Sequence, residues 1–415
     1  MSEIVSSPTR AGRADARNTG VLVVFTALTN LADGVLKVAL PLAAIALTDS
    51  PAAVAAVATT LTLPWLLTSL HVGVLVDRFD RRRLLLVANL ARVATMVCLV
   101  SALAADSVSL PLIYTGGALM GVAEVVATTA SVALAPSAVT PVGRERANAW
   151  MAGAETACGE FTGPFAGGLL VAVGAGLALG ATGAAYVLGM LVLMLLVGRF
   201  APLSQGERPV GSVHHRIREG LLYLWRQPML RGTALLLTVL CACWGAWLAL
   251  MPLVATDLLD LSAGEYGALM SALGAGGLVG ALTVGWVNRL LGRRWAMFAD
   301  LLGTAAMMAA PALSSNVWVV GAAAFLGGMG GTLWTVNTRT ISQRIVPTAV
   351  LGRFSAAFRL FGWGAMPLGA VLVGAVAELA GVRVAFGFFA LAALLAVVPF
   401  LRVVTPGALA AVPEH

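Results

Sequence analysis

The sequence is poor in charged residues. Asp, Glu, Lys and Arg make up only 11% of its 415 residues, whereas about 25% is usual for soluble domains. Hydrophobic residues make up 59%, and apolar runs of about 20 residues, each long enough to cross the hydrocarbon core of a bilayer, recur along the whole chain. The composition excludes a string of soluble domains and predicts an all-α polytopic membrane protein.

Several chemistries are excluded by what is missing. The only lysine, Lys37, follows a leucine, so there is no GK[ST] phosphate-binding loop and no ATP hydrolysis to drive the protein. There is no HExxH motif and no Cys/His spacing typical of a metal site. The few cysteines lie in apolar runs; they are Cys98, Cys158, Cys241 and Cys243. We therefore expect no enzymatic activity, no cofactor and no metal, and energy that comes from an ion gradient.

The apolar runs predict twelve membrane-spanning helices. The predicted spans are 20–47, 51–76, 84–105, 110–135, 147–173, 177–197, 232–256, 264–287, 295–313, 317–337, 354–377 and 384–401. Of the 25 arginines, Arg92 lies within the third span and Arg383 alone lies in a loop on one side, while the remaining 23 lie on or near the other side. Positively charged loops stay in the cytoplasm. This segregation predicts a multi-pass membrane protein with both termini cytoplasmic, and it explains the net charge of +7 without nucleic-acid binding.

The chain divides into two halves whose sequences resemble each other at corresponding positions. A polar linker, 199–231, separates residues 20–198 from residues 232–402, and RRRLLLVANLARVATM in the first half corresponds to GRRWAMFADLLGTAAM in the second. This internal repeat predicts two six-helix bundles related by a pseudo-symmetry axis along the membrane normal. Within the linker, VHHRIREGLLYLWR predicts a helix lying in the inner membrane interface. Residues 1–19 and 403–415 are predicted cytoplasmic tails.

Two motifs carry a resemblance to a known family. The hairpin GVLVDRFDRRR between the second and third spans resembles the loop signature G-x-L-x-D-R-x-G-R-[KR]-[RK] of the major facilitator superfamily, with Asp80 in place of the usual glycine. The stretch GEFTGPFAGG in the fifth span resembles the antiporter signature G-x-x-x-G-P-x-x-G-G. Its matching residues are Gly159, Gly163, Pro164, Gly167 and Gly168. Further stretches such as RERANAWMAG resemble the drug:proton antiporter-3 branch, which includes macrolide, multidrug and siderophore exporters.

The resemblance implies a major facilitator fold in a bacterial plasma membrane, and export rather than uptake. The expected function is proton-coupled export of small hydrophobic drugs, antibiotics or siderophore-like metabolites by alternating access, carried out by a monomer in the lipid bilayer. One alternative is a dedicated exporter of a single secondary metabolite or siderophore. Another, from a different class, is a non-transporting membrane sensor or scaffold. Sodium stays open as the coupling ion, and the sequence does not identify the substrate.

The hairpin motif predicts a conformational latch. Asp77 lies at the inner end of the second span, and the eleventh span begins on the same side near Arg353, with its positive dipole end facing inward. A carboxylate can bond those free amides and pair with the arginine only when the halves close on this side. The predicted latch consists of Gly73, Asp77, Arg78, Arg81, Arg82 and Arg353. The alternative is that the arginines only anchor the topology and Asp77 offsets their charge.

The antiporter motif predicts close helix packing in the fifth span. Gly159, Gly163 and Gly167 recur every four residues, so one face of the helix lacks side chains and a neighbouring helix can approach it closely. By resemblance, this face is expected to seal against the other half of the protein and limit leakage. Pro164 removes an amide hydrogen and invites a kink.

Ionisable residues inside the spans are the sharpest functional signal, because they are costly in lipid. The set consists of Asn30, Asp33 and Lys37 in the first span, Glu124 in the fourth, and Glu155 and Glu160 in the fifth. Asp33 and Lys37 stand four residues apart and can pair. A carboxyl group in a low-dielectric region can bind and release protons near neutral pH, so we rank Asp33, then Glu124, then Glu160 for proton coupling. The alternative is a static charge cluster that holds the helices together.

Tryptophans offer a second kind of candidate site. They lie in the seventh, tenth and eleventh spans, at Trp244, Trp247, Trp334 and Trp363. Flat apolar rings suit a large, partly aromatic substrate. Packing within the bundle or contact with lipid is the alternative role for each of them.

Overall fold

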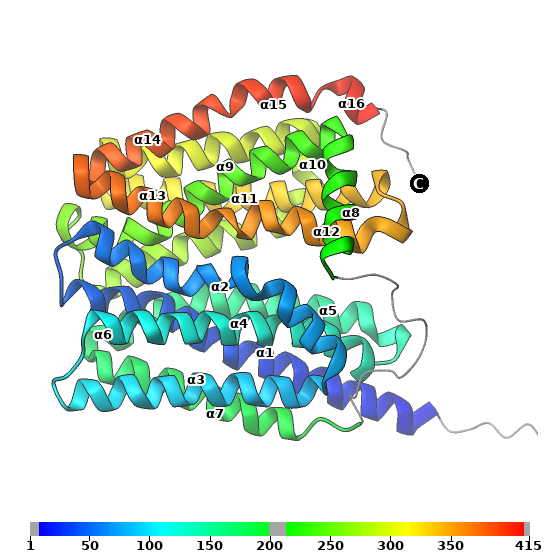
Figure 1. Ribbon diagram of the computed structural model, residues 1–415, viewed down its shortest axis with the longest axis horizontal. Coiled ribbons are helices and arrows are strands. Elements are labelled where there is room, and N and C mark those ends of the chain that lie inside the picture. The colour runs from blue at the N-terminus through cyan, green and yellow to red at the C-terminus, as the bar shows by residue number, and fades with distance from the viewer. Residues whose placement is uncertain (1–7, 199–212, 411–415) are drawn as a thin grey trace, which may run out of the picture.

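The computed structural model describes residues 8–198 and 213–410, and these ranges are almost entirely helical, with no strand among them. The long helices run side by side along one axis, and one short helix crosses their ends (Figure 1). A helix satisfies its own backbone hydrogen bonds, which is what hydrocarbon demands of a spanning segment. The arrangement confirms the predicted all-α class.

The N-terminal half, α1 to α7, supplies the first six predicted spans. Its elements are α1 (Pro8–Ile45), α2 (Pro51–Arg78), α3 (Arg81–Ala104), α4 (Leu110–Ala138), α5 (Pro141–Glu155), the π-helical turn η1 (Thr156–Thr162), α6 (Gly163–Val173) and α7 (Ala175–Met194). Short connections start new helices with side-chain caps: Ser50 accepts the Ala53 amide before α2. The fifth span is therefore one path through α5, η1 and α6.

The C-terminal half supplies the remaining spans. After α8 (Val213–Arg226), its elements are α9 (Pro228–Leu253), the π-helical turn η2 (Val254–Leu258), α10 (Ala263–Leu313), α11 (Val317–Ile345), α12 (Thr348–Trp363), α13 (Ala365–Ala380), α14 (Val382–Leu395), α15 (Val397–Val403) and α16 (Pro406–Ala410). α12 and α13 form the eleventh span and break at Gly364. α14 and α15 form the twelfth.

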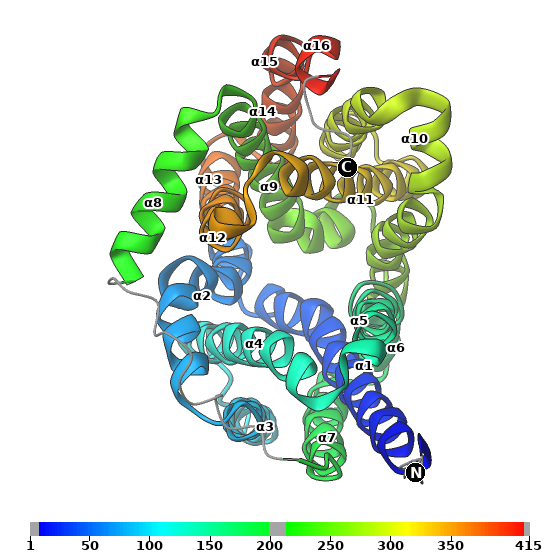
Figure 2. The same cartoon turned by 90° about the vertical axis from the view of Figure 1, so that its right-hand side faces the viewer.

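The eighth and ninth predicted spans are joined in α10. Gly292 interrupts this element with φ 78° and ψ 157°, a left-handed conformation that glycine adopts without the steric cost other residues meet. Two helices are thus joined within α10, which folds back on itself (Figure 2). By length and composition, ten helices in the described residues could cross a membrane. That number agrees with twelve spans, because α10 holds two of them and the fifth span is divided into shorter pieces.

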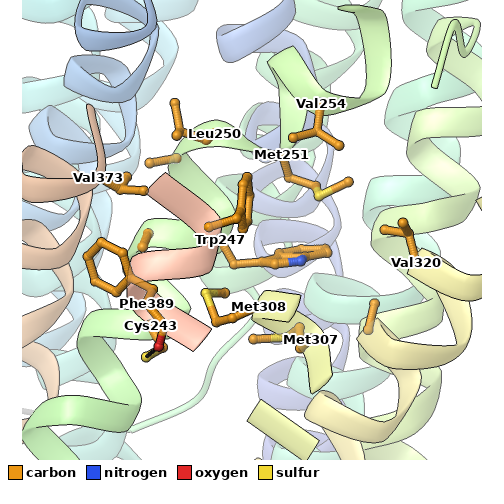
Figure 3. Close-up of a cluster of buried hydrophobic side chains, with 14 of the residues drawn as sticks. Cys243, Trp247, Leu250, Met251, Val254, Met307, Met308, Val320, Val373 and Phe389 are labelled. Carbon is orange, nitrogen blue, oxygen red and sulfur yellow. Dashed lines mark hydrogen bonds between the residues drawn. The ribbon is translucent and has the colours of Figure 1, made fainter. Parts of the chain in front are cut away.

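The two halves form separate bundles. Figure 2 looks along the helices from the end that carries α8, with α1 to α7 on one side and α8 to α16 on the other. Leu22 and Val125 lie in a buried cluster of the first bundle. The largest buried cluster belongs mainly to the second bundle, where Trp247, Met308 and Phe389 pack together (Figure 3).

The ends of the bundle differ in charge. The end that carries α8 is here called the arginine-rich end. Arg17 and Arg82 lie there and donate to carbonyls at the end of α7. Arg353 lies there too and pairs with Glu219 of α8. At the opposite end Arg383 donates to Ser315. The segregation of arginines expected from the sequence is therefore present in the fold.

Two seams join the halves toward the opposite end. In the first, Ser50 Oγ donates a 2.8 Å hydrogen bond to Glu378 at the ends of α2 and α13, and Trp65 stacks on Trp363 further along. In the second, α6 packs on α10, and a Cβ on Gly168 would lie 2.8 Å from the Gly267 Cα. At the arginine-rich end α2 contacts α12 far less than it contacts α13.

Some boundaries differ from those expected from the sequence. α1 already begins at Pro8, inside the stretch assigned to the N-terminal tail, and α16 lies inside the stretch assigned to the C-terminal tail. α8 falls where the linker helix is predicted, and it crosses the ends of the long helices (Figure 1). Residues 1–7, 199–212 and 411–415 lie outside the described residues.

Candidate functional site

Asp33 is the centre of a buried network in the N-terminal half. The Tyr186 hydroxyl of α7 donates a 2.6 Å hydrogen bond to Asp33 Oδ1, and Arg92 Nη2 of α3 lies 3.4 Å from Asp33 Oδ2. The guanidinium carbon of Arg92 also lies 5.0 Å from the centre of the Tyr186 ring, close enough for a cation–π contact. Arg92 is 2% exposed and Asp33 19%. Asp33 therefore pairs with Arg92, and the expected pairing with Lys37 is wrong.

Lys37 pairs with the fifth span instead. Its Nζ lies 2.6 Å from Glu160 Oε1, and the two side chains are 35% and 50% exposed. The pair joins α1 to the π-helical turn η1. It is far more accessible than the Asp33–Arg92 pair, so it is the charged contact that solvent or a substrate can reach.

The π-helical turn presents Glu160 to α1. Its register is shown by the Gly163 amide, which donates to the carbonyl five residues back at Cys158, and by the Thr162 hydroxyl, which donates to Ala157. Gly159 packs on α1, where a Cβ would lie 3.2 Å from Asn30 Oδ1. π-Helical turns inside α-helices occur frequently at functional sites.

The other two predicted acids lie around this pair. Glu124 of α4 is partly buried and interacts electrostatically with Asp33, Lys37, Arg92 and Glu160. Glu155, at the end of α5, is exposed and lies within electrostatic reach of Glu160 and Lys37. The structure thus brings together every acid that the sequence analysis selected inside the spans.

The cluster has more acids than bases. Its carboxyl groups are those of Asp33, Glu124, Glu155 and Glu160, and its cations are Lys37 and Arg92. Unpaired carboxylates in a low-dielectric region are costly, so such groups bind protons or a cation. This arrangement can therefore take up and release positive charge.

The glycine face of the fifth span meets a different partner from the expected one. Gly163 and Gly167 pack on Gly34 and Val35 of α1, as Gly159 packs on Asn30, so this face lies against its own half. The expectation that it seals against the other half is wrong. The C-terminal half is instead met by Pro164 and Gly168, which lie on a neighbouring face of the same helix.

Burial separates the four candidate tryptophans. Trp247 and Trp334 are fully buried in the C-terminal half (Figure 3 shows Trp247), so neither ring offers surface to a substrate in this conformation. Trp244 is partly buried. Trp363 is 46% exposed and stacks on Trp65, with ring centres 5.1 Å apart, across the line between the halves.

The predicted latch residues lie at the arginine-rich end. Asp77 is in the last turn of α2, and its side chain is not among those that the structure describes. Asp80, the departure from the family pattern, caps α3 by accepting the Arg83 amide at 2.9 Å. Arg82 donates to Met194 within its own half.

The other residues of the predicted latch also lie toward the arginine-rich end. Arg353 pairs with Glu219 of α8. Gly73 has open space where a Cβ would lie, and Arg78 is exposed. Arg81 begins α3.

Two residues of the central network are absent from the candidates selected from the sequence. Arg92 stands out as an arginine inside the third span, but that observation alone does not give its partner. Tyr186 is one of only four tyrosines and lies in an apolar run. A tyrosine hydroxyl inside such a run needs a hydrogen-bond partner, and that need is the signal that could have found it.

Two matching bundles of membrane-length helices, with ionisable side chains held inside one of them, define a membrane transporter of the alternating-access class. The chain belongs to the family of transmembrane secretion effectors within the major facilitator superfamily, because that family's model matches residues 18–412. The membership confirms the resemblance stated from the two sequence motifs.

Sequence relatives include exporters. The chain is 27% identical over 377 residues to the multidrug efflux pump Tap of Mycolicibacterium fortuitum, covering 88% of this chain and 91% of that one. It is 29% identical over 389 residues to Tap of Mycobacterium tuberculosis, covering 90% of each. It is 30% identical over 310 residues to the enterobactin exporter EntS of Shigella boydii, covering 73% of this chain and 71% of that one.

Solved structures share the fold. A mutant of the nucleoside transporter NupG matches with a TM-score of 0.76 at 11% identity, covering 94% of this chain and all (100%) of that one. A bacterial homologue of the iron transporter ferroportin matches with a TM-score of 0.68 at 17% identity, covering 93% and 98%. These likenesses confirm the predicted twelve-helix major facilitator fold.

Proposed function

We propose that this protein is a proton-coupled exporter of small hydrophobic drugs, antibiotics or siderophore-like metabolites. The observation that carries the proposal is the acid-rich cluster around the accessible Lys37–Glu160 pair, placed inside a fold whose relatives include a multidrug efflux pump and an enterobactin exporter. The protein would move its substrate without converting it. A monomer suffices, because one chain supplies both halves.

The charge balance of the cluster supports protons as the coupling ion. Arg92 stays protonated at any physiological pH, and Asp33 is its partner in a pair that is almost closed to solvent. Glu160 pairs with Lys37, but that pair is 50% and 35% exposed and can break and reform more readily than the buried Asp33–Arg92 pair. This geometry favours Glu160 and Glu124 over Asp33 for carrying the proton, with Asp33 as the structural partner of Arg92. Sodium is the alternative cation for the same carboxylates.

The contacts between the halves support an alternating-access cycle. We infer that the arginine-rich end faces the cytoplasm, because positively charged loops stay there, and that α8 lies in the inner interface with Leu222 and Trp225 exposed toward lipid. The halves meet through seams toward the opposite end. This conformation then corresponds to an inward-facing state, which opens outward as the halves rock.

Transport measurements in cells test the function directly. Cells that make the protein should accumulate less of a fluorescent hydrophobic drug than cells without it, and a protonophore should abolish the difference. A difference confined to one metabolite would favour the dedicated exporter. Equal accumulation of every compound tried, with the protein present in the membrane, would favour the sensor or scaffold.

Replacing Asp77 by asparagine is expected to lower export about tenfold while leaving the amount of protein in the membrane unchanged. An amide cannot supply the charge that closes the inner side, and coupling between such sites is typically worth about 1–3 kcal/mol. Asp80→Asn is the matched control, because asparagine caps a helix as well as aspartate does and Asp80 caps α3. Normal export by the Asp77 variant would end the latch proposal.

A further inference from the structure

The turn that carries Glu160 has carbonyl groups in excess of amide donors. In η1 the backbone bonds run to the residue five back, and beyond it the helix returns to bonds four back. Such a change of register leaves one carbonyl without an amide. Pro164, directly after the turn, has no amide hydrogen and leaves another. Within a membrane these oxygens need partners from elsewhere.

The other half of the protein brings a hydrogen-bond donor to this turn. Ser271 of α10 lies opposite the turn, and its hydroxyl oxygen lies 2.7 Å from the Phe161 carbonyl, nearer than the 2.9 Å to the Gly267 carbonyl of its own helix. Gly274, one turn further along α10, approaches the Glu160 carbonyl so closely that a Cβ would have no room there. Ser271 is 5% exposed, so water does not compete for this bond in the present conformation.

The same turn therefore faces both halves. The Glu160 side chain reaches Lys37 of α1, and the backbone of Glu160 and Phe161 lies on α10. Any movement that separates α6 from α10 removes the Ser271 donor from the turn. Any change in the Glu160–Lys37 pair also moves this turn.

We propose that Ser271 is a positioning residue, which holds the Glu160-bearing turn in its π register and closes the second seam, so that release of the Glu160–Lys37 pair and opening of this seam occur together. The role of Ser271 in transport rests on the function proposed above. The coupling between the Glu160–Lys37 pair and the second seam does not rest on it, because this coupling is a property of the two halves and is measured without any substrate.

Hydroxyls on the same helix provide a matched control. Thr283 of α10 is partly buried, and its hydroxyl, like that of Ser271, has an acceptor four residues back on its own helix, Val279, but within the described residues it has none in the other half. Gly285 has open space around a Cβ, whereas Gly274 has none. Thr283→Ala and Gly285→Ala thus change the same chemical groups without touching the seam.

Distances between two spin labels, measured by double electron–electron resonance, test the proposal. Labels at Val173→Cys of α6 and Ala268→Cys of α10, both exposed positions, report opening of the seam in protein whose four native cysteines are replaced by serine. Ser271→Ala should raise the population with the labels far apart by about fivefold, the effect of one hydrogen bond. Gly274→Ala should raise it further. Thr283→Ala and Gly285→Ala should leave it unchanged.

A double-mutant cycle separates positioning of Glu160 from simple packing. Lys37→Gln and Ser271→Ala act on the same turn, so their combined effect on the open population should differ from the product of the single effects by at least about twofold. Multiplicative effects would overturn the proposal. So would an unchanged population in Ser271→Ala, or an equal response in Thr283→Ala. If the protein moves no solute but these distances shift as expected, only the proposed function fails.

Discussion

Replacing Arg92 by methionine is expected to destabilise the protein by about 3 kcal/mol, the usual cost of removing one partner of a buried ion pair. The change leaves Asp33, only 19% exposed, beside Tyr186 without the cation that pairs with it, since Lys37 is paired with Glu160. Thermal unfolding of the purified protein in detergent measures the loss. Export should fall with it, because the distorted network includes α1, α3 and α7.

The double variant Asp33→Asn/Arg92→Met provides the control for this expectation. Removing both charges together avoids an unpaired buried carboxylate, and such replacements are often close to neutral. Its unfolding temperature should therefore recover most of the loss. Arg289→Met, at an exposed arginine of α10, should change little. Equal unfolding temperatures for Arg92→Met and the unmodified protein would show that the Asp33–Arg92 pair does not support the fold.

The sequence predicts the architecture well because lipid imposes simple rules. Length, apolar composition and the side on which arginines lie determine the number and direction of spans, and all three are visible in the chain. The apolar pattern does not show whether a helix runs unbroken through a span. Pro164 suggests a kink in the fifth span, but the π-helical register of η1 depends on tertiary contacts of Gly159 and Glu160 with neighbouring helices.

The pairing of charges is harder to predict than their presence. Spacing within one helix brings Asp33 and Lys37 within reach, yet each finds its partner on another element, Arg92 on α3 and Glu160 in η1. Partners between helices depend on how the helices rotate against one another, which one helix's periodicity does not give. The same applies to Trp247, whose burial follows from packing across the C-terminal half.

Replacing Glu160 by glutamine is expected to abolish the stimulation of transport by a proton gradient, at least a tenfold loss, while substrate exchange without a gradient persists. The reason is that glutamine can keep a hydrogen bond to Lys37 but cannot bind and release a proton. Everted membrane vesicles with an acidic lumen measure gradient-driven uptake, and equilibrated vesicles measure exchange. Glu265→Gln, at an exposed acid at the start of α10, is the matched control.

The same vesicles rank the remaining acids. Glu124→Gln should reduce gradient stimulation less than Glu160→Gln does, since Glu124 is partly buried beside Asp33, Lys37 and Arg92. Asp33→Asn should impair gradient-driven transport and exchange alike, because it leaves Arg92 buried without its carboxylate and disturbs the network rather than the proton step. Selective loss of gradient stimulation in Asp33→Asn, with exchange intact, would assign the proton to Asp33 instead. Full activity in all three variants would leave the cluster as a static support that holds α1, α4 and the fifth span together.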